Sequence, residues 1–149
     1  MEQTSAGQPF RNLKKIATDN GINIMACATS ICDLIGKRIA TIENVGGSLV
    51  FNTTGGCYVM NPDADDESRI WLEDICGDVN DVIGPTIVFA EEISNSEWPG
   101  DVPKEFCYET CTWTFYRIAT QNGMIIIRWC GTSNGYNSEA VKFEKIHNP

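Results

Sequence analysis

The amino-acid sequence predicts an α+β fold: two N-terminal helices, then a mostly antiparallel β-sheet of about six to eight strands with one short helical turn. Three observations predict this class. Apolar residues recur at helical spacing before Gly36, the period changes to two after it, and Asn122-Gly123 separates two runs rich in β-branched and aromatic residues. Asn-Gly favours a hairpin because both residues tolerate the positive φ of a twist-matched turn.

The N-terminal part divides into a polar lead and a helical segment. Residues 1–9 are polar and without periodicity, so we expect a flexible lead. Residues 10–36 are expected to hold both helices. The first begins at Phe10 and ends at Asn20-Gly21, a left-handed stop, and the second spans residues 24–35, whose apolar stripe precedes Gly36.

Residues 37–147 are expected to form one antiparallel β-rich domain, since 149 residues suit a single core. Asp74 is expected to cap a helical turn that continues to about Ile83. The predicted strands, separated by Gly, Pro and Asn turns, cover residues 37–45, 48–53, 57–60, 69–73, 86–93, 112–120, 124–129 and 138–146.

Composition excludes several function classes. The formal charge is −9, from 20 acids and 11 bases, which disfavours direct binding to DNA, RNA or anionic membranes. His147 is the one histidine, so an imidazole-based metal site or a histidine-dependent triad is not expected. Seven cysteines without a CxxC pair, no signal-peptide pattern and no apolar run of membrane-spanning length predict a cytoplasmic protein with reduced thiols.

An acidic loop is the first candidate site. Asp63, Asp65, Asp66 and Glu67 cluster in five residues, and with Asp74 they partly follow a calcium-loop spacing. The spacing lacks the required glycine and the bidentate glutamate, so calcium or magnesium binding is disfavoured. A solvated loop and a contact with a basic partner remain the alternatives, and we expect no bound metal.

Aromatic and arginine residues of the C-terminal half form the second candidate site. Strand alternation places Trp113 and Arg117 on one face, opposite Tyr116. An aromatic plane beside guanidinium donors suits a nucleotide, whose base stacks while its phosphates accept bidentate hydrogen bonds. The alternatives are core packing for the aromatic residues and solvation for the arginines. The candidate ligand-binding residues are Trp113, Tyr116, Arg117, Arg128, Trp129, Asn134, Tyr136 and Asn137.

Catalysis has no positive sequence signal. Glu91 and Glu92 are adjacent strand residues, so their carboxylates point to opposite faces and do not share a substrate readily. No nucleophile elbow, zinc motif, P-loop or dinucleotide fingerprint is present. We therefore expect neither an enzyme nor a cofactor.

Ordered sequence blocks resemble a family of small uncharacterised proteins of phage and prophage genomes. The blocks run from Trp71 to Val79 with Ile83-Gly84, from Ala90 to Ser94, from Thr112 to Thr120, and through Arg128-Trp129 to Tyr136, and the likeness covers roughly residues 33–146. The family pattern carries a His, an Asp, a Cys pair and a Glu before the first block. Here only Asp65 of that set remains, which disfavours metal-dependent activity.

The resemblance implies a cytoplasmic phage accessory protein, and small acidic proteins of this kind often act against host defence. One mechanism is sequestration of a nucleotide immune signal, cyclic or of the ADP-ribose type, in a pocket that a homo-oligomer could complete. The alternative is an acidic, anti-CRISPR-like inhibitor that occupies the nucleic-acid channel of a basic host defence protein, with the acidic loop at its centre. A structural or enzymatic accessory role is the third hypothesis.

Overall fold

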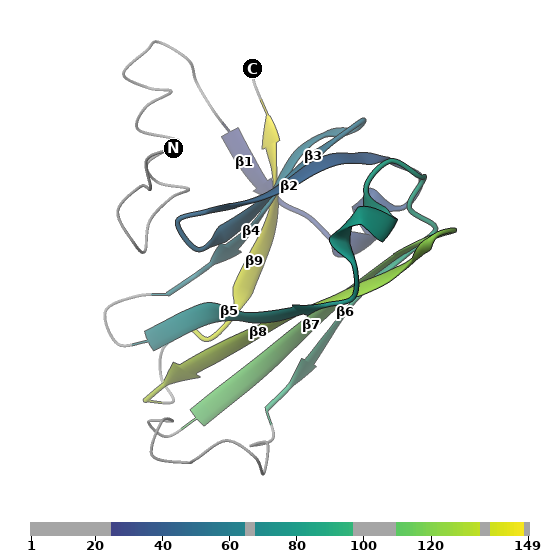
Figure 1. The fold of residues 1–149 in the computed structure, drawn as a ribbon. Helices are drawn as coiled ribbons and strands as arrows, with labels where there is room; N and C mark the ends of the chain where they lie inside the picture. Colours follow the sequence, from purple (N-terminus) through teal and green to yellow (C-terminus); the bar gives the residue numbers. More distant parts are fainter. Residues whose placement is uncertain (1–24, 65–67, 97–109, 135–137, 148–149) are drawn as a thin grey trace.

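The computed structural model describes residues 25–64, 68–96, 110–134 and 138–147, and these form two antiparallel sheets (Figure 1). The first sheet has the strand order β1-β9-β4-β3-β2 and the second β5-β8-β7-β6. The strands are β1 (Met25–Ala28), β2 (Ile39–Val45), β3 (Ser48–Thr53), β4 (Gly56–Pro62), β5 (Ser68–Cys76), β6 (Phe89–Asn95), β7 (Thr110–Thr120), β8 (Gly123–Ser133) and β9 (Val141–His147).

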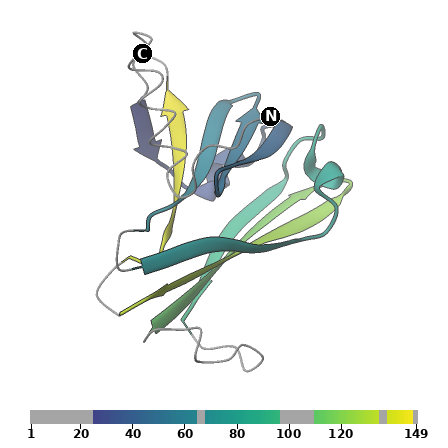
Figure 2. The same ribbon diagram turned by 60° about the vertical axis from the view of Figure 1, so that its left-hand side comes forward.

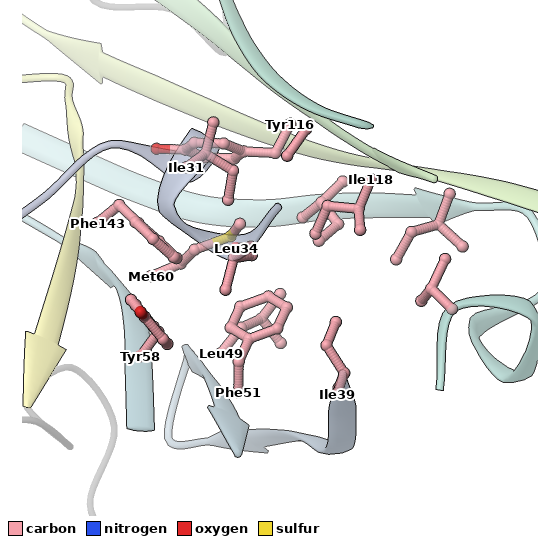
Figure 3. Close-up of a cluster of buried hydrophobic side chains, with 14 of the residues drawn as sticks. Ile31, Leu34, Ile39, Leu49, Phe51, Tyr58, Met60, Tyr116, Ile118 and Phe143 are labelled. Carbon is pink, nitrogen blue, oxygen red and sulfur yellow. The ribbon is translucent and has the colours of Figure 1, made fainter. Parts of the chain in front are cut away.

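The two sheets lie in separate layers, and the core fills the space between them (Figure 2). Side chains from both sheets point into this space, as Figure 3 shows for Phe51, Tyr58 and Tyr116. Phe143 of β9 joins the layers, because its ring stacks on Tyr58 of β4 at 5.4 Å and contacts Tyr116 of β7 at 6.4 Å between centroids. Aromatic contacts of this kind add to the stabilisation from area burial.

The predicted fold class is wrong, because the described chain is β throughout apart from two short 3-10 helices, η1 (Ile31–Leu34) and η2 (Val79–Val82). The expected helix over residues 24–35 is instead strand β1 followed by η1. Its first residues pair with β9, where Ala26 faces Ile146. Ser30 caps η1, and Ile31 and Leu34 point into the core. A three-residue repeat of buried residues suits a single 3-10 turn as well as an α-helix, which explains the error. The other predicted helix, over residues 10–20, lies outside the described residues.

The second predicted helical turn is shorter than expected. The strand β5 continues past Asp74 to Cys76, with a bulge between Leu72 and Asp74. Asp78, not Asp74, caps η2, and its Oδ1 accepts a hydrogen bond from the Asn80 amide at 2.9 Å. A bulge absorbs one residue without ending a strand, so alternation alone does not reveal where β5 stops.

The hairpin of β7 and β8 is present as predicted. Its register runs from Thr110 opposite Ser133 to Thr120 opposite Gly123, which leaves Gln121 and Asn122 as the turn. The Thr120 hydroxyl accepts a hydrogen bond from the Asn122 amide at 3.2 Å. Asn122 does not take the positive φ expected of it, since all positive φ values in the described chain belong to glycines.

Candidate functional site

Strand alternation in the central hairpin gives the second sheet two different faces. Trp113, Phe115 and Arg117 of β7 lie on the face turned away from the first sheet, and Arg128 of β8 lies opposite Phe115 on that same face. Tyr116 points the other way into the core. The outward face therefore carries three of the candidate ligand-binding residues.

The remaining candidates do not lie on this face. Tyr116 and Trp129 are fully buried between the sheets, where they pack with the main core. Asn134 follows the end of β8 and is half-buried. Tyr136 and Asn137 lie outside the described residues. The eight-residue set is thus divided, and Tyr116 and Trp129 serve the core because inward positions of a two-layer protein are covered by the other sheet.

The acidic candidate residues are described only in part. Asp63 follows β4 and forms an ion pair with Lys142 of β9, with 3.4 Å between Oδ2 and Nζ. Asp65, Asp66 and Glu67 lie outside the described residues. Within the described chain, no group of three His, Cys, Asp or Glu side chains is arranged to hold a metal ion.

Neighbouring strands complete the outward face. Trp71 of β5 lies in the same cross-strand row as Cys130 and Trp113. Ile93 of β6 lies in the row of Phe115 and Arg128. Phe89, also of β6, lies in the row of Ala119 and Met124. We call this surface the aromatic–arginine face; its members are Arg69, Trp71, Glu73, Asp74, Phe89, Glu91, Ile93, Trp113, Phe115, Arg117, Met124, Ile126 and Arg128.

The arginines of this face already have carboxylate partners. Arg117 pairs with Glu91 at 3.2 Å and Arg128 with Glu73 at 3.6 Å. The Glu73 carboxylate also accepts a hydrogen bond from Trp71 Nε1 at 3.2 Å. Both ion pairs are partly exposed, so they orient the side chains more than they stabilise the fold.

The tryptophans of the face differ in accessibility. The Arg128 guanidinium lies 5.4 Å from the centre of the Trp113 ring, and Trp113 is only 7% exposed. Trp71 is 36% exposed, with Arg69 at 5.8 Å from its ring centre. The exposed aromatic plane is therefore that of Trp71, which the sequence analysis did not select.

Three N–H groups beneath this surface have no acceptor among the described residues. Trp113 Nε1, Arg117 Nε and Arg128 Nε are buried, and none of them has a hydrogen-bond partner in that part of the chain. A buried donor without an acceptor costs about 1–3 kcal/mol, so a ligand that supplies acceptor oxygens would find donors in place.

Large exposed apolar side chains concentrate on the same face. Trp71, Phe89, Ile93 and Met124 are 36%, 39%, 40% and 46% exposed. Only Ile35 and Val88 are comparably exposed elsewhere in the described chain. Sequence analysis missed this group because its members come from three strands, β5, β6 and β8, whose order in the sheet differs from their order in the sequence. The signal was present as the outward half of each alternating pattern.

Two cysteines lie at one end of the face. Cys111 and Cys130 are buried next to Trp113, with 4.0 Å between their sulfur atoms.

A third cysteine, Cys76, is exposed, and its hydrogen bond to the Asp74 carboxylate raises the pKa of the thiol. A raised pKa lowers the thiolate fraction, so Cys76 is a weak nucleophile.

A separate hollow of about 470 Å³ lies beside the turn of the β7–β8 hairpin. Arg38 and Val88 line it together with Gly84, Pro85, Thr86 and Gln121. It is lined by one cationic side chain and no carboxylate, and none of the sequence-predicted site residues contributes to it.

None of the helices in the described part of the chain has the length and apolar character of a membrane-spanning segment.

Fold and site together define a two-sheet antiparallel β-protein with an exposed aromatic and arginine surface on its second sheet. The model of the family called domain of unknown function DUF7448 matches residues 32–143. The chain belongs to this family. No curated protein and no solved structure matches the chain.

Proposed function

We propose that the protein acts by binding, and that a protein partner docks on the aromatic–arginine face. The observation that carries this proposal is the gathering, on one face and among three arginines, of four of the six large exposed apolar side chains that the described residues contain. Protein interfaces are enriched in aromatic residues, methionine and arginine. Tryptophan and arginine are also the commonest interface residues with large energetic contributions.

The same geometry favours a protein over a nucleotide. Phosphate groups would have to displace Glu91 and Glu73 from the two arginines, and a base would have to displace Arg128 from Trp113. A protein surface needs neither exchange, because it can cover the existing ion pairs and pack on Trp71 and Met124. The partner expected from the family resemblance is a host defence protein, and the counter-defence role stays a prediction.

Nucleotide sequestration is the second candidate function. The buried donors of Trp113, Arg117 and Arg128 favour it, because an anionic ligand would satisfy them. Such a ligand would have to bind with movement of the overlying carboxylates. The non-enzymatic role stays a prediction in either case.

A pair of matched variants tests the protein-docking proposal. Trp71→Glu places a charge on the face, and Val88→Glu places the same charge on a more exposed apolar position that lies off it. Each tagged variant is expressed in a bacterial host and captured, and bound proteins are quantified. We expect one protein to be retained by the wild type and by Val88→Glu but lost with Trp71→Glu. Equal retention by both variants would refute docking on this face.

A thermal-shift panel tests sequestration. Cyclic dinucleotides and ADP-ribose derivatives are added to the full chain, because a ligand at one hundred times its Kd stabilises the folded state by about 2.7 kcal/mol. A shift with one compound that Arg117→Lys reduces would favour sequestration. The ligand should then be recovered intact after denaturation, whereas a converted product would indicate an enzyme.

A further inference from the structure

The strand β6 forms one edge of the second sheet and pairs only with β7 (Figure 1). Its other side meets η1 at its beginning, where the Cys32 thiol donates a hydrogen bond to the Ala90 carbonyl at 3.4 Å. The Ala90 carbonyl therefore points away from β7. Because the groups of an antiparallel strand alternate in direction, the amide and carbonyl of Glu92 and of Ser94 point away from β7 as well.

This part of the edge is open in the described structure. Glu92 and Ser94 are exposed, and none of the described backbone groups bonds to their outward amides and carbonyls. Phe89 and Ile93 of the same strand are exposed on the aromatic–arginine face. A chain that paired with β6 would therefore lie directly beside the apolar part of that face.

The chemistry along this edge is acidic. The strand carries Glu91 and Glu92 and no basic residue. Glu91 is paired with Arg117, whereas Glu92 forms no ion pair with another described residue. Opposite Glu92 on β7, the Tyr116 hydroxyl is buried, and its pKa is raised first by burial and then by the neighbouring Glu92 carboxylate. An ammonium or guanidinium group placed here would meet an exposed carboxylate that forms no ion pair within the described chain.

We propose that the partner adds an extended, basic segment as a strand to the open edge of β6, with a lysine or arginine against Glu92. This inference rests on the proposed docking function and names its geometry. The added strand would bond to the outward amides and carbonyls of Glu92 and Ser94, as in other cases of β-strand addition. Its side chains on the outer side would cover Phe89 and Ile93.

Glu92 also selects which strands can pair. Charged residues on an edge strand commonly prevent pairing between identical chains, and two copies of β6 would bring their glutamates together. The same carboxylate favours a basic strand, so one residue both blocks self-pairing and specifies the partner.

The experiment uses two short capped peptides, one alternating lysine and valine and one alternating glutamate and valine, added to the full chain. Amide hydrogen exchange and peptide titration report the site and the Kd. Two variants act on the edge: Glu92→Gln removes the charge, and Ser94→Pro removes an outward donor without touching the β6–β7 ladder. Glu43→Gln is the control, since Glu43 is an exposed glutamate on β2, an edge strand of the other sheet.

We expect the lysine peptide to protect the amides of Glu92 and Ser94, and the glutamate peptide to leave them unprotected. Glu92→Gln and Ser94→Pro should each raise the Kd about tenfold, whereas Glu43→Gln should leave it unchanged. Unaltered binding by Glu92→Gln, or protection confined to other segments, would overturn the inference, even if Ser94→Pro failed to fold. Loss of the cellular partner with Trp71→Glu but not with Ser94→Pro would retain the docking face and reject the added strand.

Discussion

The hydrogen bond between Tyr58 and Asp33 fastens η1 to the first sheet. The buried Tyr58 hydroxyl donates to the Asp33 carboxylate, which also forms an ion pair with Lys37 at 3.6 Å. Because η1 also contacts the beginning of β6 through Cys32, this bond helps to hold the edge of the second sheet in place. We predict that Tyr58→Phe destabilises the fold.

The size of the effect follows from the environment of the bond. Hydrogen bonds to charged groups contribute about 1.5–3 kcal/mol, and the Asp33 side chain is 41% exposed, so water replaces the lost donor in part. Phenylalanine keeps the ring stacked on Phe143 at 5.4 Å. We therefore expect Tyr58→Phe to lower the free energy of unfolding by about 1.5 kcal/mol.

The same bond makes the effect depend on pH. The Tyr58 hydrogen bond is the main cause that lowers the pKa of Asp33, with the charges of Lys37 and Lys145 adding to it against the opposing effect of burial. Since the folded-state pKa lies below the unfolded one, this stabilisation is fully present above about pH 4 and is lost as the pH falls through the folded-state pKa. The difference between wild type and Tyr58→Phe should therefore shrink in acid.

Urea unfolding at neutral pH and near pH 3, followed by circular dichroism, measures both effects. Tyr116→Phe is the control, because Tyr116 is equally buried but its hydroxyl has only the neighbouring Glu92 carboxylate and forms no hydrogen bond of standard geometry within the described chain. Removing that hydroxyl should cost less than removing the hydroxyl of Tyr58. A loss below about 0.3 kcal/mol in Tyr58→Phe, or equal losses in the two variants, would refute the assigned role of the Tyr58–Asp33 bond.

Three further outcomes are expected. The Glu139 carboxylate accepts hydrogen bonds from the hydroxyls of Thr112, at 2.7 Å, Thr110 and Ser133. In urea titrations, Glu139→Ala should therefore lower the free energy of unfolding by about 2 kcal/mol, and Glu139→Gln should lower it by less. Gly131→Ala should cost about 1–3 kcal/mol in the same assay, since its added Cβ would lie 2.4 Å from the Glu139 carbonyl oxygen. Alkaline unfolding should begin above about pH 10, because burial raises the pKa of both Tyr58 and Tyr116; their stabilising effect is complete below the unfolded-state pKa and declines above it, which a pH titration of the melting temperature would show.

Local pattern was enough to predict strands β2 to β9, with shifted ends, but neither β1 nor the division of the strands into two sheets. The β7–β8 hairpin follows from alternation and a polar turn, both of which are local. Membership of β9 in the first sheet depends on its pairing with β1 and β4, which are far away in the sequence. The predicted helix at residues 24–35 was wrong for a related reason, because pairing of Ala26 with Ile146 outweighed the helical spacing of the apolar residues.

The candidate site was predictable to the same extent. Alternation within β7 correctly separated Trp113 and Arg117 from Tyr116. It did not reveal that Trp71 of β5 lies in the same row as Trp113, since that depends on the register of β5 against β8. Sequence also could not show that Glu91 and Glu73 hold the two arginines, because both ion pairs join different strands.

The arrangement of charge on the second sheet gives a final prediction. The central strands β7 and β8 contribute Arg117 and Arg128, and the edge strands contribute Arg69, Glu73, Asp74 and Glu91, so three bases meet three acids on this face. The rest of the chain then holds eight of the 11 bases and 17 of the 20 acids, and the whole net charge of −9 lies off the face. A partner on the aromatic–arginine face meets no net charge there, so its affinity should fall only modestly with salt, through screening of the single contact between its basic residue and Glu92. An inhibitor that mimicked nucleic acid through its acidic surface would instead bind through long-range attraction. At 0.1 M salt this attraction is largely screened beyond about 10 Å, so the affinity would fall steeply as salt rises. Partner retention measured from low to high salt separates the two mechanisms, and a steep loss that Trp71→Glu does not alter would assign binding to the acidic surface.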